Sequence, residues 1–137
     1  MRGASGALAK ACAPECERGA LSKGDPNAQS LSSHSFIRRD VAGLTTRIGH
    51  HDPDLARQLR RASSAVALNT AEGMHARGRS RMACYNIALR EMRESYAVLE
   101  VSVLLRYLPP LDAELEDRIQ RILATLYRLS FPRQAAR

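Results

Sequence analysis

The sequence predicts an all-α protein with a single bundle domain, an antiparallel up-down-up-down four-helix bundle. Aromatic residues make up only 4% of the chain and Trp is absent, so the core must consist of aliphatic side chains, as close-packed helices allow. Apolar residues recur at steps of three and four along four segments, which is the spacing of one helix face. The connections between these segments are short, which favours antiparallel neighbours. We find no strand pattern and no internal repeat.

The chain divides into a leader over residues 1–30, the bundle over residues 31–131 and a tail over residues 132–137. The leader is rich in Gly, Ala, Ser and Pro without an apolar period, which is typical of disorder. Lys10 interrupts it before a signal peptide could form. Cys12 and Cys16 lack the second pair of ligands that a zinc site would need. With Cys84 the chain has three cysteines, an odd number without a paired framework, so we expect reduced thiols in the cytoplasm.

The first helix is expected to begin near Ser33 and to end at residues 49–51. Its apolar stripe consists of Ile37, Val41, Leu44 and Ile48. Gly43 weakens this helix by up to about 1 kcal/mol relative to Ala. A helix this short depends on packing for its stability.

The second helix should begin with Asp52 as N-cap and Pro53 at its first position, and should stop near Gly73. Its heptad-like stripe consists of Leu55, Leu59, Ala62, Val66, Asn69 and Gly73. Because an unpaired buried amide costs roughly 1–3 kcal/mol, we predict that Asn69 bonds across the bundle. Glu72 is expected to meet an arginine of the third helix.

The third helix is the longest expected, from about Ser80 to Leu108. Its stripe consists of Met82, Tyr85, Leu89, Met92, Tyr96, Leu99 and Val103. Apolar residues surround its C-terminal half almost completely, so either its own bundle or another subunit must cover that half. We favour a subunit interface made of Val98, Val101, Leu104, Leu105 and Leu108.

The fourth helix follows two prolines at positions 109 and 110, with Asp112 or a neighbour at its start and several acids in its first turns. Its stripe consists of Leu115, Ile119, Ile122, Leu126 and Leu129.

The formal charge is +7, and 19 of the 21 basic residues are Arg. Between positions 57 and 93, only Glu72 and Glu91 oppose a basic cluster of Arg57, Arg60, Arg61, Arg77, Arg79, Arg81, Arg90 and Arg93. Such a cluster can neutralise phosphates, with strong salt dependence. Aromatic residues are scarce nearby, so we expect contacts to the backbone with little base reading. The alternative to nucleic-acid binding is a solvated face whose arginines form salt bridges to the fourth helix of a neighbouring subunit. The alternative explanation of the Arg excess is a coding bias toward Arg.

No catalytic residue, metal or other cofactor is expected. A di-iron bundle needs the Glu-x-x-His motif on two helices, and Glu72 with His75 supplies it once, across Gly73. Cys84 falls beside the stripe of the third helix, where thiols are usually inert. No phosphate-binding glycine loop is present, and no stretch approaches the roughly 18 apolar residues of a membrane span.

Residues 58–73 read QLRRASSAVALNTAEG and resemble the signature helix, roughly Q-L-R-R-A-x-x-S-V-x-x-N-I-A-E-G, of the bacterial 23S rRNA intervening-sequence proteins. Residues 85–88, Glu94 and the Leu-rich run toward Leu108 resemble the third helix of that family. The resemblance covers about residues 35–130. The chain differs from the pattern at Ala65, Thr70, Arg90 and Glu91. The resemblance identifies Gln58, Asn69, Glu72, Gly73 and Glu94 as motif residues.

Members of that family are four-helix bundles that form homopentameric rings without established enzymatic activity. A related branch, the accessory variability determinant of diversity-generating retroelements, binds a reverse transcriptase and nucleic acid as a basic pentamer. The resemblance thus implies a cytoplasmic, homo-oligomeric adaptor that binds RNA, DNA or a reverse transcriptase. The alternative is a scaffold that binds only proteins.

Overall fold

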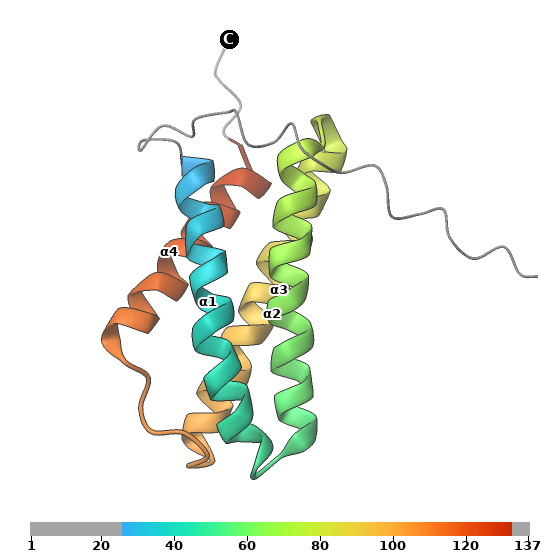
Figure 1. Cartoon of the computed structure of the whole chain (residues 1–137). Coiled ribbons are helices and arrows are strands. Elements are labelled where there is room, and N and C mark those ends of the chain that lie inside the picture. The colour runs from blue at the N-terminus through green and yellow to red at the C-terminus, as the bar shows by residue number, and fades with distance from the viewer. Residues whose placement is uncertain (1–25, 133–137) are drawn as a thin grey trace, which may run out of the picture.

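The computed structural model describes the backbone of residues 26–132 and the side chains of residues 38–132. Within this part of the chain there are four helices and no strand, which confirms the all-α class. The helices are α1 (Pro26–Gly49), α2 (Pro53–His75), α3 (Gly78–Leu104) and α4 (Ala113–Ser130). They lie side by side as a bundle (Figure 1).

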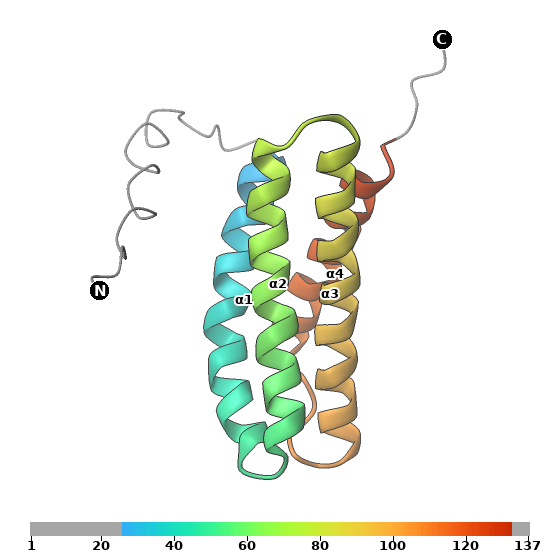
Figure 2. The ribbon, with the colours of Figure 1, turned by 90° about the vertical axis from the view of Figure 1, so that its right-hand side faces the viewer.

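The connections alternate between the two ends of the bundle. The α1–α2 and α3–α4 connections lie at the lower end in Figure 2, and the α2–α3 connection lies at the upper end, where α4 also finishes. At the lower end His51 stacks on Tyr107, with 5.0 Å between the ring centroids. α1 and α3 each contact both α2 and α4. None of the four described helices combines the length and apolar character of a membrane span.

The helix starts predicted at Asp52 and Asp112 are confirmed. The Asp52 carboxylate accepts hydrogen bonds from the N–H groups of Asp54 and Leu55 at 3.0 and 2.9 Å. The Asp112 carboxylate accepts one from the N–H of Glu114 at 3.4 Å. Each cap satisfies N–H groups that lack a partner inside the helix, so α2 and α4 begin at these residues.

The predicted apolar stripes build the core. The largest apolar side chains that are fully buried are Ile48, Leu59, Tyr85, Met92, Leu99, Ile119, Ile122 and Leu126. Small hydroxyl residues fill narrow places between the helices, and their O–H groups donate to the carbonyl four residues earlier at 2.6 to 2.8 Å; they are Thr45, Ser63, Thr70, Ser102 and Ser130. These bonds leave the buried hydroxyls satisfied without a partner on another helix.

Three predicted boundaries differ from the structure. α1 begins at Pro26, upstream of the expected start at Ser33, so it is not short and includes residues 26–30 of the expected leader. α2 continues through Gly73 to His75, and α3 ends at Leu104. The remaining leader, with Cys12 and Cys16, lies outside the described residues, as do residues 133–137 and the Ile37 side chain.

The expected subunit interface on α3 needs a correction. Val98 and Leu108 are buried in the core of their own bundle, because the chain folds back after α3. The remaining three side chains stay exposed: Val101 to 41%, Leu104 to 80% and Leu105 to 51%. These three form the exposed α3 end, which is all that remains of the expected interface.

A turn at Arg106 produces this fold-back. The Tyr107 N–H donates to the Ser102 carbonyl at 2.9 Å, and the Arg106 N–H donates to the Val103 carbonyl at 3.0 Å. This is the bonding of a Schellman motif, which needs a left-handed residue after the helix. Arg106 supplies it with φ of 62°.

Candidate nucleic-acid interface

The eight arginines of the predicted basic cluster lie on α2, α3 and the connection between them. Seven of them are exposed, and Arg81 is partly buried. Arg57, Arg60 and Arg61 lie in the first turns of α2, whereas Arg77, Arg79 and Arg81 lie at the upper end. At 1.5 Å of rise per residue, about 20 Å of helix separates these two sets. The cluster is therefore split between two regions of the bundle.

Three of the eight arginines have an intramolecular partner. Arg57 pairs with Asp54 at 2.9 Å, and Arg61 pairs with Glu94 at 2.7 Å across the α2–α3 contact. Arg81 lies over the ring of Tyr85, 5.5 Å from its centroid. The exposed ion pairs of Arg57 and Arg61 each contribute about 0–1 kcal/mol to the stability of the fold.

The other five arginines have no ion pair within the described residues, and they are Arg60, Arg77, Arg79, Arg90 and Arg93. The acids at the start of α4, which could have paired with these arginines, have partners in their own helix. Glu114 pairs with Arg118 at 2.9 Å, and Asp117 pairs with Arg121 at 2.6 Å. The unpaired guanidinium groups remain available to phosphates.

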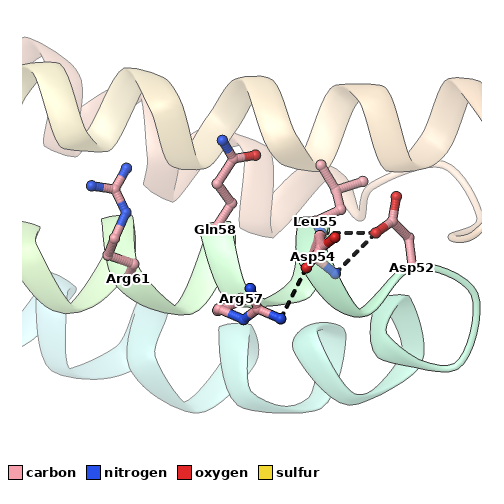
Figure 3. A pocket seen from close by; sticks show the side chains of 6 residues that line it. All are labelled: Asp52, Asp54, Leu55, Arg57, Gln58 and Arg61. Carbon is pink, nitrogen blue, oxygen red and sulfur yellow. Dashed lines mark hydrogen bonds and ion pairs between the residues drawn. The ribbon is translucent and has the colours of Figure 1, made fainter.

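The pocket drawn in Figure 3 lies at the lower end of α2 and mixes both charges. Two acids and two arginines line it, and its residues are Asp52, Asp54, Leu55, Arg57, Gln58 and Arg61. Gln58 and Arg61 project on the side of α3 in this view, and Arg57 projects on the side nearer α1. The carboxylates there offset the guanidinium charges, so this pocket is a poor site for a polyanion.

A second pocket, which we call the upper pocket, combines three arginines with apolar side chains. It joins the first turn of α3 to the last turn of α4, and its lining residues are Gly78, Arg79, Arg81, Met82, Arg128, Leu129 and Pro132. No carboxylate of residues 38–132 lines it. Arg128 was not among the predicted residues, because it lies far along the chain and only the return of α4 to the upper end brings it there (Figure 1).

Two exposed aromatic residues lie at the end of α4, next in sequence to residues that line the upper pocket, and neither was predicted from the sequence. Tyr127 and Phe131 are 54% and 55% exposed, and their ring centroids lie 5.2 Å apart. Their chain neighbours Arg128, Leu129 and Pro132 line the pocket. The expectation that aromatic residues are nearly absent around the arginines therefore needs correcting at this end.

The motif residues have structural roles that differ from those predicted. The Asn69 amide donates to the Ala65 carbonyl of its own helix at 2.9 Å, so the predicted bond across the bundle is wrong. Glu72 is exposed and has no ion pair within the described residues. It is Glu94 that links α2 to α3, through Arg61, while Gln58 is exposed.

Gly73 is buried against Tyr85. A Cβ added to Gly73 would lie 2.8 Å from Tyr85 Cε1, which is closer than real side chains approach. The glycine thus sets the distance between α2 and α3 and does not end the helix. Because α2 continues past it, Glu72 and His75 do share one helix. Within the described residues, no three His, Cys, Asp or Glu side chains come close enough to hold a metal ion.

The likeness to the intervening-sequence proteins rests on the sequence of residues 58–73 and 85–94. The structure adds a four-helix architecture and a basic upper pocket, neither of which is specific to one family. Comparisons of the chain with protein-family models, curated proteins and solved structures found no match, so membership of that family stays a prediction.

Proposed function

We propose that this chain is a non-enzymatic, cytoplasmic adaptor that assembles with copies of itself and binds nucleic acid, RNA or RNA/DNA, through its basic surface. The observation that carries the proposal is the upper pocket, which Arg79, Arg81 and Arg128 line with no carboxylate among the described residues. A guanidinium group is always charged and matches a phosphate with two parallel N–H donors. Several such groups in one place favour a ligand with several phosphates.

Self-association is supported by the exposed α3 end. Val101, Leu104 and Leu105 place apolar side chains on the surface near the lower end, away from the upper pocket. The finer form of the proposal follows the family resemblance: up-down-up-down bundles in a homopentameric ring, with a reverse transcriptase as protein partner. A ring would repeat the upper pocket on every subunit and so steepen the salt dependence of binding.

A scaffold that binds only proteins is the second candidate, and Leu68 and Ile87 favour it. Both side chains are exposed, to 70% and 42%. Leu68 is seven residues from Arg61, and Ile87 is seven residues from Glu94, the two members of the α2–α3 ion pair. Seven residues are about two helical turns, so Leu68 and Ile87 lie at one level on neighbouring helices. They form a small apolar area that a protein partner could cover.

Fluorescence anisotropy of labelled RNA, titrated with the full chain between about 50 and 200 mM salt, separates the two candidates. We expect binding that weakens steeply with salt. Arg79→Gln with Arg128→Gln should reduce the slope of log K against log salt by about 0.7 for every phosphate of a single strand that the variant no longer neutralises. The control is Arg57→Gln with Arg121→Gln, which removes the same amount of charge outside the upper pocket. These two arginines pair with Asp54 and Asp117, so their loss should leave the slope unchanged. Absence of binding at low salt rejects the nucleic-acid role.

A further inference from the structure

The upper pocket and the aromatic pair both lie at the end of α4, at the upper end of the bundle. Gly78, Arg79, Arg81 and Met82 come from the first turns of α3, and the remaining lining residues come from the end of α4. Figures 1 and 2 both show these two helix ends at the upper end of the molecule. Residues about fifty positions apart in the sequence are thereby brought together.

The electrostatics of this surface favour an anion. Besides the three lining arginines, Arg77 occupies the N-cap position of α3, where its side chain makes no capping hydrogen bond. The first turn of α3 contains no acidic residue. Within the described residues neither the N-cap side chain nor an acid of the first turn accepts from the N–H groups of that turn, and the helix dipole places partial positive charge at the same point. These groups reinforce the guanidinium charges next to them.

The aromatic pair adds a second kind of contact. Tyr127 and Phe131 lie one helical turn apart on α4 and contact each other at an interplanar angle of 49°. More than half of each side chain faces solvent, although aromatic residues are scarce in this chain, with four Tyr and two Phe in total. Exposed aromatic rings at the same helix end as arginines offer a single strand a stacking surface for its unpaired bases and cations for its phosphates.

We propose that the upper pocket with Tyr127 and Phe131 is a site for single-stranded nucleic acid. The arginines contact the phosphates, and the exposed aromatic rings stack against unpaired bases. In a duplex the bases already stack on one another and present only their edges, so a double strand uses the arginines alone. This inference rests on the proposed nucleic-acid binding and specifies the strand that is bound.

The test compares three labelled ligands of one sequence, single-stranded RNA, single-stranded DNA and the RNA duplex, in anisotropy titrations of the full chain. We expect both single strands to bind more tightly than the duplex. Tyr127→Leu with Phe131→Leu keeps apolar side chains but removes the rings. This double variant should weaken single-strand binding at least about tenfold, and should leave duplex binding and the salt slope unchanged.

Two controls make the test specific. Tyr107→Leu removes an aromatic ring at the lower end, and should leave the affinity for single strands unchanged. A strand containing 2-aminopurine reports stacking directly, and its fluorescence should be quenched by the wild-type chain but not by the double variant. Circular dichroism checks that each variant is folded.

The outcomes distinguish this inference from the proposed function. If the chain binds no ligand at low salt, the nucleic-acid function fails and this inference fails with it. If the wild-type chain binds duplex as tightly as single strands, or the double variant binds single strands normally, only this inference is overturned. If the double variant instead changes the oligomeric mass, the rings are a contact between copies, which also overturns it.

Discussion

At the scale of single residues, Gly73 determines how closely α2 approaches α3. Adding a Cβ there would place it 2.8 Å from Cε1 and 3.1 Å from Cδ1 of the buried Tyr85 ring. We expect Gly73→Ala to lower the free energy of unfolding by about 1–3 kcal/mol, because the ring cannot move out of a packed core. The loss should appear in urea denaturation followed by circular dichroism.

Gly43 provides the matched control for Gly73. It also lies inside a helix, but a Cβ there meets no atom within 4 Å. Gly43→Ala should stabilise the chain by up to about 1 kcal/mol, the difference in helix propensity between the two residues. Equal effects of both substitutions would contradict the proposed role of Gly73.

Tyr96 reports the contact between α3 and α4. Its hydroxyl donates to the Glu116 carboxylate at 3.0 Å, and this hydrogen bond, followed by burial, raises the pKa of Tyr96 above 10.0. Only the protonated phenol donates, so the contribution to stability is complete below the ordinary pKa and is lost as the pH rises through the raised pKa.

Glu116→Gln should therefore lower the pKa of Tyr96 toward its ordinary value, measured by NMR titration of the assigned Tyr96 ring. Glu114→Gln is the control, because Glu114 pairs with Arg118 instead. An unchanged Tyr96 pKa in Glu116→Gln would show that this hydrogen bond is absent in solution.

Residue-scale prediction succeeded for burial and failed for polar partners. Periodicity placed Leu59, Leu99 and Leu126 in the core, because burial depends only on which face of a helix a residue occupies. It could not show that Asn69 bonds to its own helix, because that choice depends on side-chain geometry. For the same reason the ion pair between Arg61 and Glu94 could not be predicted from the sequence.

At the scale of helices, the boundaries marked by a capping aspartate were predicted best. Asp52 and Pro53 gave the start of α2, and the same Asp-Pro pair at positions 25 and 26 was an unused signal for the start of α1. Composition suggested a leader there and outweighed the local signal. The end of α3 was misplaced because Arg106 occupies a left-handed position at which Gly is expected.

The turn at Arg106 yields an element-scale prediction. A left-handed conformation costs a non-glycine residue roughly 1–2 kcal/mol, so Arg106→Gly should raise the free energy of unfolding by about 1 kcal/mol in urea denaturation. The same change at Arg93, an exposed residue inside α3, should lower it by about 1 kcal/mol. Destabilisation by Arg106→Gly would mean that the turn has another conformation.

The exposed α3 end yields a second prediction at this scale. Leu104 is 80% exposed, so Leu104→Glu should leave the helical circular dichroism unchanged while lowering the oligomeric mass in size-exclusion chromatography with light scattering. A carboxylate buried between copies without a partner is strongly unfavourable. Leu68→Glu, at a position that is 70% exposed on α2, is the matched control and should retain the mass. An unchanged mass in Leu104→Glu would exclude this contact.

At the scale of the whole molecule, the two ends of the bundle differ in charge. In the part of the chain that the structure describes, the ionisable residues of the upper pocket are all arginines, whereas the lower end carries the carboxylates of Asp52, Asp54, Asp112 and Glu114. The sequence predicted the basic excess and its interruption along α2 after Arg61, but not the contribution of α4. The return of α4 to the upper end adds Arg128 to Arg79 and Arg81, and this contact depends on the whole fold. The upper pocket thus required the structure, although its arginines on α3 were predicted.

The central claim is that four amphipathic helices bury their apolar stripes and leave an apolar surplus for self-association. Sedimentation velocity of the purified full chain at micromolar concentration tests it most directly. We predict one discrete species with the mass of a homo-oligomer, a pentamer by the family resemblance. A stable monomer across the concentration range would contradict the claim.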